Sequence, residues 1–256
     1  MARMFIFGLG YTASRLAEAL REHGWRVDAT GSAGNVDFGD EEAVRGALSQ
    51  ATHVLSSVPP AGGNDPVLDR YAADLKHDWL GYLSSTGVYG DAEGAWVDES
   101  APTGGGRRKD RAICDRRWLE IGARVLRLPG IYGPGRSAFD RVKSGKANRI
   151  DMPGQVFSRV HVQDIVAGVI AALDGPAGAY NLSDDLPCAQ NCVIEEACRL
   201  LRVDPPPLQS LEKANLSDMA LGFYAENRRV ANGKAKRLLR WEPQYPTYRE
   251  GLRGLL

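Results

Sequence analysis

The chain has 256 residues, of which 43% are hydrophobic, and its 32 basic side chains equal its 32 acidic ones in number. This length allows one full-sized domain with a smaller appendage, and the balanced charge excludes a strong overall field toward nucleic acid or an anionic membrane. No apolar run approaches the roughly 18 residues that cross a bilayer, and the cysteines lack zinc-site spacing, so we predict a cytoplasmic, metal-free protein that binds a small molecule.

From the amino terminus onward, short apolar runs alternate with amphipathic stretches, which is the pattern of a parallel sheet covered by helices on both faces. The predicted strands are residues 4–8, 25–30, 35–38, 52–57, 79–85, 123–128 and 178–182. The predicted helices are residues 11–22, 40–48, a segment from Pro66, and 107–120. We therefore predict an α/β fold, a Rossmann doubly wound parallel sheet with a small irregular C-terminal substrate subdomain.

The pattern changes after residue 130, where glycines, prolines and isolated short helices replace the strict alternation. The run DPPPL at 204–208 cannot lie inside a helix or a central strand. We assign residues 1–130 and 160–182 to an NAD(P)-binding Rossmann domain, and residues 131–159 and 183–256 to a small substrate-binding or lid subdomain.

Residues 7–14 spell FGLGYTAS at the junction between the first predicted strand and the first predicted helix. In this context G-x-G-x-x-A predicts a dinucleotide site, because the first glycine permits a tight turn and the second lets the backbone approach a pyrophosphate. The amino terminus of the helix then offers free amides to the phosphates. The cofactor-binding residues predicted in this loop are Gly8, Leu9, Gly10, Tyr11, Thr12 and Ala13. The alternative is a structural turn in another kind of α/β protein.

The end of the second predicted strand bears on which dinucleotide binds. An acidic side chain there would hold the ribose of NAD, but the sequence reads Thr30-Gly31-Ser32, and Asp28 falls inside the strand. No carboxylate there repels a 2′-phosphate, although no arginine is present to bind it. We place Gly31 and Ser32 in the cofactor site and favour NADP, with NAD as the alternative.

Four further segments follow one another at intervals that cover nearly the whole chain. They are YLSSTGVYGD (82–91), RLPGIYGPGR (127–136), SRVHVQDI (158–165) and KRLLRWEPQYPTYREGL (236–252). Together they resemble the extended short-chain dehydrogenases/reductases of the NAD-dependent epimerase/dehydratase group. The glycine loop departs from that family's G-x-x-G-x-x-G, because Phe7 occupies the place of the first glycine.

The resemblance implies roles for residues at the ends of the predicted strands. Ser85 takes the position of the family's catalytic serine or threonine, with Thr86 beside it and Ser84 next to the cofactor. Other residues implied along the cofactor are Asp37 and Phe38 at the adenine, Ser56, Ser57 and Val58 at the riboses, and Leu128, Pro129, Gly130 and Ile131 at the nicotinamide. For His161 and Asp164, structural hydrogen bonding and substrate contact are both open.

The catalytic Tyr-x-x-x-Lys of the family is absent. In the resemblance, Arg107 takes the tyrosine position and Arg111 the lysine position. Arginine stays protonated at working pH and cannot readily act as the base, but its planar fork can bind a carboxylate, a phosphate or ribose hydroxyls. We include both arginines among the candidate catalytic residues, Arg111 also as a cofactor contact, and Tyr89 as another candidate proton donor.

Two functions are consistent with these residues. The first is an atypical NAD(P)-dependent oxidoreductase or epimerase that acts on a small, sugar-like carbonyl or hydroxyl compound. The second is a regulatory or scaffold protein that binds the dinucleotide without catalysis. Relatives often pair through a helix bundle, which makes the helix at 107–120 a candidate homodimer surface. Gly104–Gly106 predict a conformationally loose start of that helix.

Overall fold

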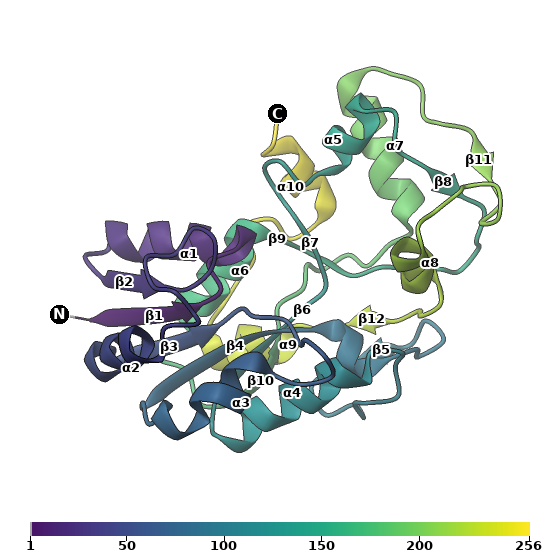
Figure 1. Ribbon diagram of the computed structural model, residues 1–256. Helices are drawn as coiled ribbons and strands as arrows, with labels where there is room; N and C mark the ends of the chain where they lie inside the picture. Colours follow the sequence, from purple (N-terminus) through teal and green to yellow (C-terminus); the bar gives the residue numbers. More distant parts are fainter. Residues whose placement is uncertain (1) are drawn as a thin grey trace.

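A six-stranded parallel sheet forms the centre of the protein (Figure 1). The computed structural model describes residues 2–256. In spatial order the strands are β10 (Gly178–Asn181), β6 (Arg124–Leu128), β4 (Trp79–Ser85), β3 (His53–Ser56), β1 (Arg3–Phe7) and β2 (Arg26–Ala29). The chain winds outward in opposite directions from β1, so a crevice is expected outside the carboxyl ends of the strands there. The predicted α/β doubly wound fold is confirmed.

Helices cover both faces of this sheet. On one face lie α1 (Tyr11–Glu22), α6 (Val162–Ala171) and α9 (Gly233–Leu239). On the other lie α2 (Glu41–Gln50), α3 (Pro66–Tyr71), the short 3-10 turn η1 (Ala72–Asp74) and α4 (Lys109–Glu120). Successive side chains of a strand point to opposite faces, so Met4 and Ile6 join the first core while Phe5 and Phe7 join the second. The sheet is therefore buried on both sides.

A smaller subdomain stands over the carboxyl edge of the sheet (Figure 1). Its third apolar core joins α5 (Ala138–Lys143), α7 (Gln190–Leu201) and α10 (Tyr248–Arg253). Beside these helices lie α8 (Asp218–Tyr224) and a parallel pair of β8 (Arg149–Ile150) with β11 (Leu208–Gln209). Two more parallel pairs connect the layers: β7 (Gly130–Tyr132) with β9 (Arg159–His161), and β5 (Trp96–Val97) with β12 (Arg229–Val230).

The structure corrects two boundaries. Residues 35–38 form no strand: Val36 makes an isolated bridge to Thr30, the residue that follows β2. Residues 235–241, predicted in the subdomain, pack on the larger domain instead, since Ala235, Leu239 and Trp241 are buried in the same core as α1 and α6. The chain then returns to the subdomain core with α10. The apolar side chains of residues 235–241 cover a part of the sheet that would otherwise face water.

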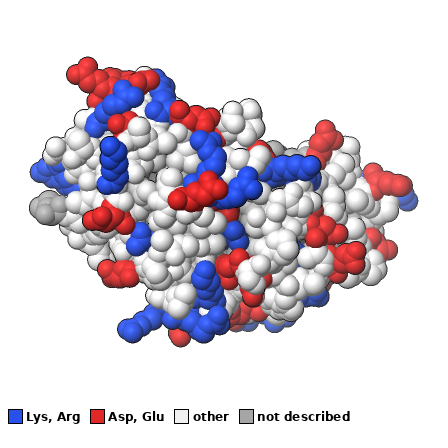
Figure 2. Space-filling model, turned by 90° about the horizontal axis from the view of Figure 1, so that it is seen from below, with Lys and Arg blue, Asp and Glu red and all other residues white. Residues whose placement is uncertain are grey.

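The surface matches the balanced composition. Acidic and basic side chains lie interspersed over the face drawn in Figure 2. Among residues 2–256, no helix is long and apolar enough to cross a membrane. The same residues contain no group of three or more histidine, cysteine or acidic side chains that could hold a metal ion.

Candidate active-site cavity

A cavity of about 890 Å³ opens between the carboxyl ends of the strands and the smaller subdomain. Its walls include the first turn of α1, the ends of β4 and β6, and residues of α5, α7 and α8. The sequence-predicted residues that line it are Gly10, Tyr11, Thr12, Ala13, Ser57, Ser84, Ser85, Thr86, Arg107, Arg111, Leu128, Pro129, Gly130 and Ile131. Ligand sites of open α/β sheets occur at this position.

The glycine loop forms the turn that the sequence predicts. Gly8 adopts a φ of 85°, and the Leu9 amide donates to the Thr30 carbonyl at 2.7 Å. Gly31 packs so closely that an added Cβ would lie 2.9 Å from the Leu9 nitrogen. Helix α1 begins at Tyr11, and Gly10 offers no side-chain cap. The amides of the first turn are therefore free to bind an anion.

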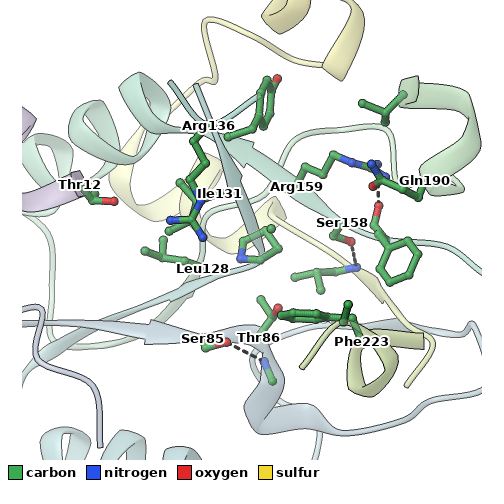
Figure 3. A pocket seen from close by; sticks show the side chains of 18 of the residues that line it. Thr12, Ser85, Thr86, Leu128, Ile131, Arg136, Ser158, Arg159, Gln190 and Phe223 are labelled. Carbon is green, nitrogen blue, oxygen red and sulfur yellow. Dashed lines mark hydrogen bonds between the residues drawn. The ribbon is translucent and has the colours of Figure 1, made fainter. Parts of the chain in front are cut away.

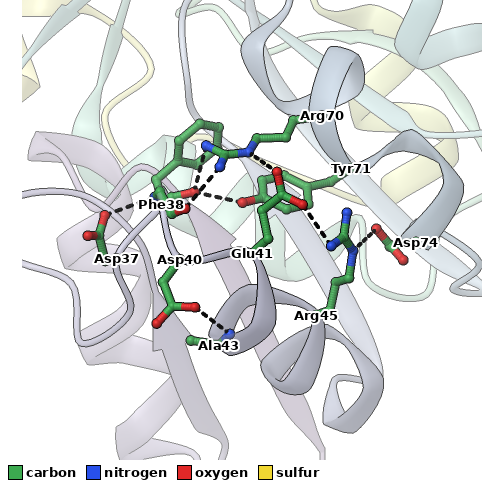
Figure 4. Close-up of polar contacts among 10 residues, drawn as sticks. Asp37, Phe38, Asp40, Glu41, Ala43, Arg45, Arg70, Tyr71 and Asp74 are labelled. Atoms are coloured by element: carbon green, nitrogen blue, oxygen red, sulfur yellow. Dashed lines mark hydrogen bonds and ion pairs between the residues drawn. The ribbon is translucent and has the colours of Figure 1, made fainter.

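The other predicted cofactor residues are not part of the cavity lining. They are Gly8, Leu9, Gly31, Ser32, Asp37, Phe38, Ser56 and Val58. Arg70 fixes the loop at Phe38: its guanidinium donates to the carbonyls of Phe38 and Gly39 at 3.3 and 2.9 Å and pairs with Glu41 (Figure 4). This segment is held in place without any ligand.

The end of β4 presents two hydroxyl groups to the cavity. Ser85 accepts a hydrogen bond from the Gly87 amide at 3.1 Å, which leaves its own proton free to donate to a ligand. Thr86 follows in the 3-10 turn η2 (Thr86–Tyr89), and both side chains lie below Leu128 in Figure 3. Ser84 also lines the cavity, but its hydroxyl donates to the buried Asp115 carboxylate at 2.6 Å.

Comparison with known proteins gives the family and the fold. No family model matches the sequence. A functionally unknown conserved protein from Silicibacter pomeroyi DSS is 38% identical, with a TM-score of 0.89 and coverage of 100% of this chain and 98% of that one. The chain belongs to the same family as that protein. Its fold is that of the extended short-chain dehydrogenases/reductases. The structure of dTDP-glucose 4,6-dehydratase from Bacillus anthracis in complex with NAD superposes with a TM-score of 0.79 at 15% identity. The superposition covers 99% of this chain and 94% of the dehydratase.

Two other proteins are similar to this chain in sequence. Protein YeeZ of Escherichia coli K12 is 27% identical over 282 residues, which cover 96% of this chain and 97% of YeeZ. A 3-diazoavenalumate denitrifying reductase from a Streptomyces species is 31% identical over 168 residues, covering 59% of this chain and 54% of the reductase.

Arg107 and Arg111, which the resemblance places at the tyrosine and lysine positions, both line the cavity. Burial lowers the pKa of Arg111, although an arginine still keeps its charge at physiological pH. Arg107 instead reaches α8, where its Cζ lies 5.6 Å from the centre of the Phe223 ring. The two arginines therefore hold different places: Arg111 is a half-buried residue of α4, and Arg107 contacts the subdomain.

The glycines before Arg107 are more constrained than the sequence suggests. The Gly104 amide donates to the Val88 carbonyl at 2.8 Å. Gly106 is buried, and a Cβ added there would lie 2.8 Å from the Gly90 Cα. Helix α4 begins three residues after Gly106, at Lys109. Close packing, not looseness, thus explains glycine at position 106.

Sequence reasoning missed most of the positive charge in the cavity. Seven arginines line it: Arg107, Arg108, Arg111, Arg136, Arg141, Arg159 and Arg228. The acidic side chains in the lining are already engaged, since Asp140 accepts from Ser137 at 2.7 Å and Glu226 accepts from Arg228 at 2.9 Å. The cavity is therefore suited to an anionic ligand.

Tyr89 does not face the cavity, which corrects its assignment as a proton donor. Its hydroxyl donates to Asn181 Oδ1 at 2.7 Å and accepts from Arg127 at 2.9 Å, and burial raises its pKa. Arg127 in turn binds the Asp115 carboxylate through two nitrogens, at 2.7 and 3.0 Å. The sequence signal for this network was Arg127, a charged residue in the apolar run ARVLRL. The network holds Ser84 in place, because the Asp115 carboxylate accepts from the Ser84 hydroxyl.

The alternatives for Asp164 are resolved by its contacts. Its carboxylate accepts from the amides of Gln244 and Tyr245 at 2.6 and 3.2 Å, and its carbonyl accepts from the Trp241 indole at 3.0 Å. Asp164 thus holds the carboxyl-terminal segment against α6. His161 is buried beside Tyr132, and burial lowers its pKa to about 4, so its ring is neutral at physiological pH.

Replacing Asp184 with asparagine should stabilise the protein at pH 8. Asp184 is 2% exposed, neither carboxylate oxygen has a hydrogen-bond partner among residues 2–256, and burial raises its pKa to about 7. The folded state binds this proton more tightly than the unfolded state, so stability falls as pH rises from about 4 to about 7. Urea unfolding should show a gain of about 2 kcal/mol for the variant at pH 8.

At pH 4 the same comparison should show almost no difference, because both proteins then carry an uncharged group at position 184. Asp204→Asn, at an exposed position, is the matched control and should leave stability unchanged at both values. A gain of equal size at pH 4 and pH 8 would show that ionisation of Asp184 has no part in the effect.

Proposed function

We propose that the protein is an NAD(P)-dependent oxidoreductase or epimerase that acts at a carbonyl or hydroxyl group of a small anionic substrate. The observation that carries this proposal is one continuous cavity, which joins Gly10 of the glycine loop, the hydroxyls of Ser85 and Thr86, and seven arginines. The NAD complex of the superposable dehydratase supports the dinucleotide, and the Streptomyces reductase supports redox chemistry.

The residues present fit a dinucleotide. The amides of Tyr11, Thr12 and Ala13 would receive its pyrophosphate, and Arg111 would donate to the ribose next to the nicotinamide. When bound, the nicotinamide supplies or accepts a hydride. The side chain of Asp28 already accepts from Asn35 Nδ2 at 2.8 Å, so no free acid at the end of β2 repels a 2′-phosphate. This arrangement favours NADP over NAD.

The hydroxyls at the end of β4 would polarise the substrate. Ser85 can donate to the substrate oxygen, because its hydroxyl accepts from the Gly87 amide and keeps its proton. Negative charge that develops on that oxygen would be stabilised by the fixed positive charges of the cavity. Arginine does not release a proton at physiological pH, so in the reductive direction the oxygen takes its proton from water.

Replacing Ser85 with alanine should lower kcat by about a hundredfold, since a hydrogen bond to the developing oxyanion is lost. The Kd for NADPH should stay the same. Oxidation of NADPH, followed by absorbance against a panel of aldehydes, ketones and aldoses, identifies a substrate and then compares the variants. Ser49→Ala on α2 is the control. If no compound is reduced, and Ser85→Ala and wild type behave alike, the proposed reaction is wrong.

The same two arginine positions favour a second function, dinucleotide binding without catalysis. Neither Arg107 nor Arg111 can replace the tyrosine as an acid and base. A protein of this kind would bind NADPH and gain thermal stability, as any ligand of the folded state provides, while it exchanges no hydride. Binding with turnover separates the first function from this one.

We also propose that the protein forms a homodimer through α4. Ile113 on this helix and Ile121 at its C-cap are each 40% exposed, so two large apolar side chains face solvent on a surface otherwise rich in charge. Sedimentation of the wild type and of Ile113→Glu would test this, since a dimer through α4 should dissociate in the variant.

A further inference from the structure

One end of the cavity holds a buried arginine that makes no ion pair among residues 2–256. Arg159 is 6% exposed, and its charge acts on the buried Asp184 carboxyl, where it opposes the rise in pKa that burial causes. Its guanidinium donates only to neutral acceptors: the carbonyls of Phe157 and Cys188 at 3.0 and 3.2 Å, the Cys188 sulfur at 3.1 Å and Gln190 Oε1 at 3.3 Å. Burial raises the pKa of Asp184 to about 7, so this carboxyl balances the guanidinium only in part at physiological pH. A buried charge that is incompletely balanced is unfavourable, and an anion bound in the cavity would complete the balance.

Two further positive features lie at this end. Arg141 lines the cavity without an ion pair among the described residues, and its charge and that of Arg159 both act on Tyr224, where they oppose the rise in pKa that burial causes. Helix α7 begins at Gln190 with no side-chain cap, so its first amides add positive potential. Figure 3 shows Arg159 extended toward Gln190 here.

The opposite side of the cavity is aromatic. Phe223 on α8 is 58% exposed although it belongs to the lining, so much of its ring is available to a ligand. Phe157 and Tyr224 form an edge-on pair with ring centres 5.3 Å apart, and they line the cavity at the Arg159 end. In Figure 3, Phe223 lies on the Thr86 side of the cavity, away from Arg159 and Gln190. An apolar surface thus separates the anion end from the hydroxyls of β4.

We propose that the substrate is an aromatic carboxylic acid, an inference that rests on the proposed function and specifies its substrate. The carboxylate binds at the Arg159–Gln190 end, the ring lies against Phe223, and the reacting carbonyl or hydroxyl group meets Ser85. The order of these groups differs from that in a nucleotide sugar, whose diphosphate stands between its aromatic base and the sugar.

Calorimetric titration of the full chain tests this order, with and without saturating NADP⁺. The probes are trans-cinnamate, cinnamyl alcohol, cyclohexanecarboxylate and uridine 5′-diphosphate. We expect trans-cinnamate to bind about tenfold more tightly than the uncharged alcohol, because the charged hydrogen bonds are lost in the alcohol. It should also bind more tightly than the other two probes. Tighter binding of uridine diphosphate, or equal binding of the alcohol, would overturn the proposal.

Two substitutions locate the binding. Phe223→Ala should weaken trans-cinnamate binding about fivefold through the lost ring contact, and Arg141→Gln should weaken it by a similar factor. Trp96→Ala is the matched control, because Trp96 is 59% exposed and lies outside the cavity lining. Binding that is unchanged in both cavity variants would overturn the proposed site.

The titrations also separate this inference from the proposed function. If NADP⁺ binds and trans-cinnamate does not, the substrate class is wrong while the dinucleotide site stands. If trans-cinnamate binds with the expected dependence on Phe223 but neither nicotinamide cofactor binds, the aromatic acid site stands and the oxidoreductase proposal fails.

Discussion

Replacing Asp115 with asparagine should lower the free energy of unfolding by about 3–5 kcal/mol, because the variant leaves Arg127 buried and without a counterion. The two side chains are 2% and 4% exposed, and they lie 2.7 Å apart. The carboxylate also accepts from the Ser84 hydroxyl and from Arg127 Nε, so both of these donors lose part of their hydrogen bonding in the variant. Urea denaturation at pH 7, followed by circular dichroism, measures the loss.

An exposed ion pair on the same helix provides the control. Arg116 and Glu120 are 68% and 64% exposed and 3.8 Å apart. Glu120→Gln should therefore change stability by less than about 0.5 kcal/mol. If Asp115→Asn were as mild as Glu120→Gln, the buried network would not stabilise the end of β4 as we describe.

Replacing Gly10 with alanine should weaken NADPH binding at least about tenfold while the free protein folds normally. Gly10 has a φ of −95°, which any residue tolerates, and a Cβ added there would meet no atom within 4 Å. The added methyl group would instead occupy the space in which the backbone approaches the pyrophosphate. Titration of NADPH fluorescence gives the two affinities, and thermal unfolding without ligand gives the stability.

Gly46→Ala is the matched control for this substitution. Gly46 is exposed within α2, far from the glycine loop in sequence, and it also has nothing within 4 Å of an added Cβ. Alanine there should raise stability by about 0.5–1 kcal/mol through helix propensity and leave the affinity for NADPH unchanged. Equal affinities for wild type and Gly10→Ala would place the dinucleotide elsewhere.

The sequence predicts the sheet well because the signal is local. Apolar runs such as MFIFG and WLGYLSS are buried on both faces, so they differ from the amphipathic helices between them. The segment at 35–38 looks like another strand but makes only one bridge, because pairing at a sheet edge depends on the neighbouring strand and not on propensity alone.

The site was less predictable because it is assembled from distant segments. Arg107, Arg141, Arg159 and Arg228 share one cavity, although 121 residues separate the first from the last. The charged run at 107–117 resembles an ordinary solvated helix, yet Arg108 lines the cavity together with Arg107 and Arg111. The Tyr89 side chain points away from the cavity because of the 3-10 turn after β4 and the hydrogen bond of its hydroxyl to Asn181 on another strand. The local sequence around Tyr89 reveals neither feature.

Calorimetric titration of the full chain with NADPH and with NADH tests the central claim most directly, because every proposed role in the cavity depends on a bound dinucleotide. We predict saturable one-to-one binding, tighter for NADPH, with a rise in melting temperature that grows with ligand concentration. Absence of saturable binding for both dinucleotides at millimolar concentration, with no shift in melting temperature, would contradict the account.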